Sequence, residues 1–202
     1  MTIVCAVKDK ENKNIILGAD TMGTVGQLKV NSMGKIIEVK IPIIDGYGEI
    51  ITEKSLWIGS SGYAFITRYI EEVFTVPFMD SQETILEYLY QEFLPELRIN
   101  LIDKNLVEVD NGVLDSNMSM LFIYEDKIFR VNSSFSVDIV TEDYSCTGSG
   151  WEVALGSIYT NLTWNPKLDK EEVVKQAVKT AGANTIYCNE EVALQVIPYI
   201  ES

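Results

Sequence analysis

The chain has 202 residues, 47% of them hydrophobic, and a mean hydropathy of +0.08, which favours a folded globular protein and excludes a disordered one. Its 16 basic and 30 acidic residues give a net charge of −14, so nucleic acid and anionic membrane surfaces are not expected partners. There is no histidine, the three cysteines are widely spaced, and no apolar run approaches membrane-spanning length, which excludes a disulfide framework, a zinc site and a membrane helix as expectations.

Strand signals fill the first third of the chain. Residues 2–7 and 15–20 are apolar on both alternating faces, so they predict two strands of a sheet that is covered on both sides. The polar residues 9–14 between them predict a hairpin connection. Residues 35–44 and 49–60 continue the β pattern around the turn DGYG.

Two helices are predicted next. Between residues 62 and 74, apolar side chains recur at every fourth position, which indicates a helix with one buried face. The sequence DSQE at residues 80–83 has the form of a capping box and predicts the start of a second helix. Pro95 is expected to bend or end that helix, because proline removes a backbone donor.

The second half of the chain repeats this order. Residues 118–146 predict strands, with a hairpin that turns at residues 125–126. Residues 148–162 predict a helix after their glycines, and DKEE at 169–172 predicts the capped start of another. Residues 191–197 predict a last strand.

Strands and helices therefore cluster along the chain rather than alternate strictly. This order is typical of antiparallel sheets with helices layered outside them. No Pro-, Gly- or Ser-rich linker, repeat or low-complexity tract interrupts the sequence, so one domain over residues 1–202 is expected. The lone thiols and the lack of a basic segment before an apolar stretch at the start favour a cytoplasmic protein.

The absence of histidine limits the chemistry that the chain can perform. Ser-His-Asp and Cys-His catalysis are excluded, and no phosphate-binding or dinucleotide-binding glycine loop is present. One mechanism needs no histidine: a hydroxyl on the N-terminal residue uses its own α-amine as the base. An α-amine has an unperturbed pKa of about 7.7–8.0, so part of it is neutral near pH 7. Removal of Met1 would place Thr2 in that position.

Six motifs occur in order along the chain: TIVCAVKD, IILGADTMGT, GKIIEV, WIGSSGYAF, CTGSG and AVKTAGANTIYCN. Together they resemble the proteasome β-subunit family of N-terminal-nucleophile (Ntn) hydrolases, above all the bacterial HslV-type and ancestral β-subunit-type peptidases. Each motif is short, and their order and spacing carry the resemblance. It implies an α/β (α+β) fold, a four-layer α/β/β/α sandwich in which helices flank two antiparallel sheets.

The resemblance also implies a set of catalytic residues. Thr2 would be the nucleophile, Lys35 would lower the pKa of that nucleophile, and Asp20 would hold Lys35 in position. Ser149 would lie near the amine of the threonine, and Gly59 would donate its backbone N–H to the oxyanion. Each residue alone has an ordinary structural explanation, such as a turn aspartate, a solvated lysine or a helix-capping serine.

Further roles follow from the resemblance alone. The backbone of Thr24 would pair with an extended substrate, and Trp57 would line the first specificity pocket, although a core tryptophan is an equal alternative. The backbone carbonyls of Gly182, Thr185 and Cys188 would hold a monovalent cation, Na⁺ or K⁺. No cofactor is required.

Three departures from the family pattern qualify these roles. HslV-type chains begin with two threonines, so one register would put Met1 at the nucleophile position, whereas the pattern CAVK favours Thr2. Ala183 occupies the place of a late carboxylate, with Asn184 beside it. The segment between residues 35 and 59 is longer than usual and contains IIDGYGEIITEK.

The leading hypothesis is a threonine endopeptidase that cleaves unfolded proteins and peptides through an acyl-enzyme. Its chains would form homo-oligomeric rings or stacked rings, served by a separate AAA+ ATPase unfoldase. Two alternatives stay open: a catalytically inactive, proteasome-like structural subunit, and an Ntn amidase that acts on small substrates.

Overall fold

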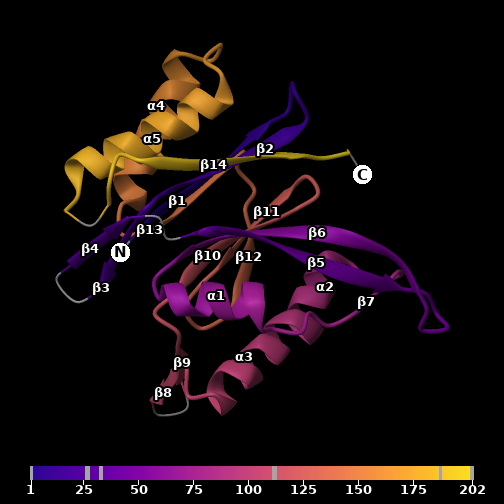
Figure 1. Cartoon of the computed structure of the whole chain (residues 1–202). Helices are drawn as coiled ribbons and strands as arrows, with labels where there is room; N and C mark the ends of the chain where they lie inside the picture. Colours follow the sequence, from indigo (N-terminus) through magenta and orange to yellow (C-terminus); the bar gives the residue numbers. More distant parts are fainter. Residues whose placement is uncertain (1, 26–27, 32–33, 111–112, 187, 201–202) are drawn as a thin grey trace.

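Two sheets lie face to face, and helices cover the outer face of each (Figure 1). The computed structural model describes residues 2–25, 28–31, 34–110, 113–186 and 188–200, with the backbone alone described at 24–25, 28–31, 108–110 and 113–114. The layers run from α4 and α5, through a four-stranded and a six-stranded sheet, to α1–α3. The expected α/β/β/α sandwich is confirmed.

The four-stranded sheet is antiparallel throughout. Its strand order is β13 (Tyr144–Gly148), β1 (Ile3–Asp9), β2 (Asn14–Asp20) and β14 (Val192–Pro198). The strands β1 and β2 form the predicted hairpin, in which Val4 is opposite Ala19. Two helices cover the outer face of this sheet: α4 (Trp151–Trp164) and α5 (Lys170–Asn184).

The second sheet has six strands, and the remaining helices cover its outer face. Its strand order is β12 (Val137–Ile139), β11 (Lys127–Val131), β10 (Ser119–Tyr124), β6 (Ile50–Ser61), β5 (Ile36–Ile44) and β7 (Met79–Asp80). Its outer face is covered by α1 (Ala64–Glu72), α2 (Ile85–Tyr88), a π-helical turn (Leu89–Phe93) and α3 (Leu94–Asp103). Two short ribbons complete the described part of the chain: β3 (Met22–Val25) with β4 (Leu28–Asn31), and β8 (Glu108–Asp110) with β9 (Val113–Asp115).

Strand β1 shows why its sequence is apolar on both faces. Its odd-numbered residues Ile3, Cys5 and Val7 pack under α4 and α5, whereas Val4 and Ala6 pack between the two sheets. Because successive strand residues point to opposite faces, a strand buried on both sides needs apolar residues at every position. The prediction of a doubly covered strand is confirmed.

Two predictions about the second helical segment were wrong. The capping box is formed by Thr84 and Glu87 rather than by residues 80–83, because Asp80 is in β7 and caps a turn instead. Pro95 does not end the helix. A π-helical turn precedes it, Pro95 is in the first turn of α3, and the helix continues to Asp103. A proline in a first turn is tolerated, because the backbone N–H groups there need no partner within the helix.

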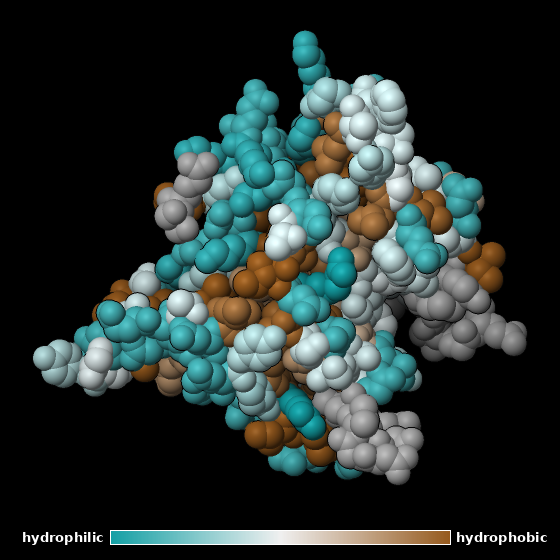
Figure 2. Space-filling model, turned by 180° about the vertical axis from the view of Figure 1, so that it is seen from behind, coloured by the Kyte–Doolittle hydropathy of each residue, from teal (hydrophilic) through white to brown (hydrophobic). Residues whose placement is uncertain are grey.

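The long segment between residues 35 and 59 forms a projecting hairpin of β5 and β6. The hairpin extends from one side of the molecule in Figure 1 and from the opposite side in the reversed view of Figure 2. Its turn is closed by hydrogen bonds from Gly48 N to Asp45 O and from Asp45 N to Glu49 O, both 3.0 Å long. None of the helices in the described ranges combines the length and apolar character that a bilayer crossing requires.

Candidate active site

A buried ion pair is at one end of the four-stranded sheet. Asp20, the last residue of β2, is fully buried, and its Oδ1 accepts a hydrogen bond of 2.7 Å from Lys35 Nζ. The same oxygen accepts a hydrogen bond of 2.9 Å from the backbone N–H of Ile3. One carboxylate oxygen therefore joins Lys35 to the residue that follows Thr2.

The second oxygen of Asp20 is also satisfied. Asp20 Oδ2 accepts hydrogen bonds of 3.3 Å from the backbone N–H groups of Met22 and Asn189. These four donors, three of them backbone groups, fix the orientation of the carboxylate. Because a buried carboxylate without partners is very costly, this arrangement explains how the negative charge is tolerated here.

Lys35 precedes β5 and is only 7% exposed. Burial lowers the pKa of its ammonium below the usual value, and the charge of Asp20 opposes that effect. Breaking this pair by removing one partner would leave an uncompensated buried charge. Asp20 therefore holds the ammonium group of Lys35 beside the start of β1.

Thr2 and Ser149 face each other across neighbouring strand ends. Ser149 Oγ accepts a hydrogen bond of 3.2 Å from the backbone nitrogen of Thr2 and lies 3.3 Å from the carbonyl oxygen of Thr2, to which it can donate. The residue beneath them, Gly148, is opposite Ile3 and has a φ of +98°. A Cβ at position 148 would overlap the carbonyl oxygen of Thr2, so only glycine lets the strands approach this closely.

These residues open onto a cavity of about 660 Å³. Thr2, Lys35 and Ser149 line it, together with residues at the end of β6, at the start of α1 and in the segment between β9 and β10. A volume of this size is within the range of small-molecule and peptide side-chain sites. The structure therefore places Thr2, Lys35 and Ser149 on one cavity, with Asp20 buried behind Lys35.

Gly59 and Trp57 do not line this cavity. Both are in β6 and face the layer between the sheets, where a Cβ at Gly59 would contact Val4 and Leu17, and Trp57 is partly buried against the same cluster. The next residue, Ser60, faces the helical side and does line the cavity, because side chains alternate along a strand. The oxyanion and substrate roles of Gly59 and Trp57 stay predictions.

Two further predicted features are described only in part. Thr24 is in β3, where its backbone is opposite Lys29 of β4, and its side chain is outside the described part of the chain. Met1, whose removal the proposed chemistry requires, is outside the described residues altogether. Both roles stay predictions.

The three residues predicted to hold a cation flank the connection from α5 to β14. Gly182 packs against the backbone of Asn189, Thr185 Oγ donates a hydrogen bond of 2.9 Å to Ala181 O, and the thiol of Cys188 contacts Thr185 and Ser149. The predicted ligands are backbone carbonyl oxygens, which Na⁺ and K⁺ accept, and the cation stays a prediction. Among the described residues, no group of three or more cysteine and carboxylate side chains is arranged to hold a metal ion.

The residues at the position of the late carboxylate are away from the ion pair. Ala183 is exposed, and Asn184 Nδ2 donates to Thr180 O at the end of α5. Asn189 has a supporting role instead: its backbone reaches Asp20, and its side chain accepts a hydrogen bond from Thr21 N and donates one to Thr21 Oγ1. Sequence reasoning missed Asn189, although it ends the motif AGANTIYCN.

We compared the chain with known protein families, curated proteins and solved structures. No protein-family model and no curated protein matches the chain. Among solved structures, BPH from Thiobacillus denitrificans, in complex with epoxomicin, has a TM-score of 0.75 and 20% identity, covering 98% of this chain and 100% of that one. HslV from Trypanosoma brucei has a TM-score of 0.61 and 15% identity, covering 98% of this chain and 99% of that one. Anbu, an ancestral β-subunit from Yersinia bercovieri, has a TM-score of 0.60 and 11% identity, covering 97% of this chain and 81% of that one.

Likeness at such low identity shows the fold. The chain has the fold of the proteasome β-type Ntn hydrolases over nearly its whole length. The resemblance found in the sequence is confirmed at this level.

Proposed function

We propose that this chain is an N-terminal threonine peptidase, with Thr2 as its nucleophile once Met1 has been removed. The observation that carries the proposal is the shared oxygen of Asp20, which joins Lys35 Nζ at 2.7 Å to Ile3 N at 2.9 Å. This arrangement ties a buried cation to the residue next to the nucleophile, beside a cavity that both Thr2 and Lys35 line. Because the chain has no histidine, the base would be the α-amine of Thr2, and the nearby Lys35 cation would lower the pKa of that amine.

The chemistry follows from the groups present. The α-amine of Thr2 takes the hydroxyl proton while Oγ bonds to the peptide carbonyl carbon of the substrate. The C–N bond then breaks, and the ammonium returns its proton to the leaving amine. Water, activated by the same amine, hydrolyses the ester. The Lys35 cation would favour the neutral amine and the developing negative charge on Oγ, and Ser149 would orient the amine.

Assembly and partners are part of the same proposal. The proteasome-like fold neighbours are consistent with a homo-oligomer built as a ring or as stacked rings. We propose in addition that this assembly acts in the cytoplasm on unfolded protein chains. A cavity of about 660 Å³ is too small for a folded domain and can hold only a short stretch of peptide, so we expect a separate ATPase to deliver unfolded substrates.

The first experiment asks whether Thr2 is the reactive N-terminus. Intact-mass analysis of the purified protein should show loss of Met1, and incubation with epoxomicin, an electrophilic epoxyketone, should add one equivalent to Thr2. Thr2→Ala should still lose Met1 but bind no probe, whereas Thr2→Ser should keep measurable labelling. Retained Met1, or labelling that survives Thr2→Ala, would refute the proposal.

The second experiment tests the cation. Lys35→Ala should reduce the labelling rate at least about 100-fold, because one preorganised electrostatic contact is worth about that much. Lys127→Ala, an exposed lysine at the start of β11, is the matched control and should label at the normal rate. Equal rates in the two variants would remove Lys35 from the mechanism.

The same measurements separate the alternatives. A structural subunit would lose Met1 or keep it but take up no probe. A small-substrate amidase would be labelled at Thr2 yet leave an unfolded protein such as reduced casein intact. Labelling together with casein cleavage would exclude both.

A further inference from the structure

The cavity beside Thr2 has a floor of hydroxyl groups. Ser60 of β6 and Thr67 of α1 are buried, their hydroxyl oxygens are 2.5 Å apart, and both line the cavity. Ser61 also lines it and donates a hydrogen bond of 2.9 Å to the carbonyl oxygen of Ser119. Each hydroxyl oxygen has two lone pairs, so these groups keep capacity to accept hydrogen bonds after satisfying one another.

The charge of the cavity is not balanced. Lys35 and Asp115 are the lining residues that carry a formal charge at neutral pH. The charge of Lys35 is matched by Asp20 at 2.7 Å. Asp115, at the end of β9, accepts a hydrogen bond of 2.9 Å from Asn117 N and forms no ion pair with any residue in the described ranges. With the α-amine of Thr2 in the neutral form that the proposed mechanism requires, the uncompensated charge in the cavity is therefore negative.

Hydroxyl acceptors and a free carboxylate suit a cationic side chain. The side chains of lysine and arginine carry hydrogen-bond donors and a positive charge, so they could donate to the hydroxyl groups and pair with the carboxylate of Asp115. An apolar side chain could do neither. An acidic side chain would meet like charge from Asp115 and from a chain whose net charge is −14. The methylene stem of a lysine or arginine could contact Met22 and Met118, which also line the cavity.

On the basis of the proposed peptidase function, we infer that the cavity selects substrates with lysine or arginine immediately before the scissile bond, with Asp115 as the specificity-determining residue. The carboxylate acts on the substrate side chain and takes no part in bond breaking. Its effect is a difference in kcat/KM between substrates that share everything except this side chain.

The test uses fluorogenic tripeptides that differ only in the residue before the cut: lysine, arginine, norleucine or glutamate. Norleucine has the same straight-chain stem as lysine without the charge. For the full assembled protein, kcat/KM for lysine and arginine should exceed that for norleucine by about two- to fivefold, with glutamate lowest. Raising the salt concentration should narrow the difference, because exposed charges are screened.

Asp115→Asn should bring the ratio of lysine to norleucine close to one. Asp138→Asn, an exposed aspartate of β12 outside the cavity lining, makes the same change in net charge and should leave the ratio unchanged. Norleucine cleaved as fast as lysine by the unmodified protein, or an unchanged ratio in Asp115→Asn, would overturn the inference while the peptidase proposal stands. Absence of cleavage for every peptide, together with absence of epoxomicin labelling, would overturn both.

Discussion

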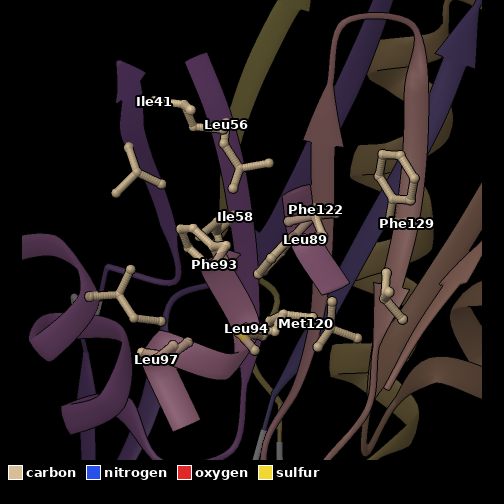
Figure 3. Close-up of a cluster of buried hydrophobic side chains, with 14 of the residues drawn as sticks. Ile41, Leu56, Ile58, Leu89, Phe93, Leu94, Leu97, Met120, Phe122 and Phe129 are labelled. Carbon is tan, nitrogen blue, oxygen red and sulfur yellow. The ribbon is translucent and has the colours of Figure 1, made fainter. Parts of the chain in front are cut away.

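The two outer layers of the sandwich are packed with different side chains. Between the six-stranded sheet and α1–α3 the core is rich in aromatic rings, among them Phe93, Phe122 and Phe129 (Figure 3). Phe93 touches Phe74 and Phe122 edge-on, with 5.4 and 5.7 Å between ring centroids. Between the four-stranded sheet and α4–α5, the buried hydrophobic residues that the structure describes are all Ile, Val, Ala or Cys. The candidate nucleophile, its carboxylate and its serine belong to this second, small-residue half, whereas Lys35 reaches them from the start of β5 in the other sheet.

Small side chains let main-chain segments come close together. A Cβ at Gly18 of β2 would overlap Val174 of α5, and a Cβ at Gly150 would lie 3.1 Å from Ala181 and 3.2 Å from the thiol of Cys188. Close packing of backbone against helix fixes strand ends, and the candidate site is built on strand ends. The aromatic half buries large surfaces instead and so contributes much of the stability. We therefore expect the layer of α4 and α5 to fix the positions of the strand ends at the site, and the layer of α1–α3 to supply more of the free energy of unfolding.

The largest expected effect comes from Gly148→Ala in the small-residue half. The φ of +98° is unfavourable for alanine, and the new Cβ would overlap the carbonyl oxygen of Thr2. We expect a loss of about 4 kcal/mol or more in the free energy of unfolding, measured by urea denaturation, and no epoxomicin labelling. Gly46→Ala, at a position with open space around it, is the control and should change neither. Normal labelling of Gly148→Ala would break the proposed link between close packing and the site.

Phe93→Ala should lower the stability of the protein without affecting its labelling. Removing a fully buried ring that contacts three other aromatic rings should cost about 3–5 kcal/mol in the free energy of unfolding. At a temperature where the variant is still folded, its labelling rate should equal that of the unmodified protein. If the labelling rate fell in proportion to the loss of stability, the aromatic layer would also be needed to position the site residues.

Some of this division could be predicted from the sequence. The strand hairpins, the helix capped by Asp169 and the doubly buried β1 follow from local patterns and are present as expected. The meeting of Thr2, Asp20, Lys35 and Ser149 could be predicted from the family resemblance, although no local rule brings four such distant residues together.

Other features depend on packing that no local pattern contains. The capping role of Thr84 is decided by β7, which takes Asp80 into the sheet edge. The positions of Gly59 and Trp57 depend on which face of β6 looks toward the first sheet, and a strand buried on both sides gives no periodicity from which to decide. The support of Asp20 by Asn189 arises only where the turn before β14 meets the end of β2.

A third prediction uses pH to probe the aromatic half. Tyr88 is fully buried, donates a hydrogen bond of 2.8 Å to Pro77 O, and burial raises its pKa well above 10.0. Above pH 10 the unfolded chain releases this proton while the folded protein keeps it, so the stability from this group is complete below pH 10 and falls as the pH rises further.

Tyr88→Phe should therefore cost about 1 kcal/mol at pH 8, the value of one hydrogen bond. This difference should shrink and reverse above pH 10, by about 1.4 kcal/mol for each pH unit. Urea denaturation at pH 8 and pH 11 measures it, with Tyr47→Phe at the exposed hairpin turn as the control. A difference that stays constant between the two pH values would contradict the assignment.

The smallest expected effect is a gain. Gly156 is inside α4 with open space around it, so Gly156→Ala should add about 0.5–1 kcal/mol to the free energy of unfolding by favouring the helix. The melting temperature should rise slightly with unchanged labelling. A loss of labelling would mean that even the solvent side of the small-residue half is coupled to the site.

The position of β1 has a practical consequence for anyone who handles the protein. Strand β1 is an interior strand of its sheet, Thr2 at its start faces the cavity, and the two ends of the chain are at opposite ends of that sheet (Figure 1). If Thr2 is the proposed nucleophile, an affinity tag fused ahead of it would extend into the cavity and would replace its free α-amine by an amide. A purification handle placed after the edge strand β14 would leave the molecule at the far end and spare both.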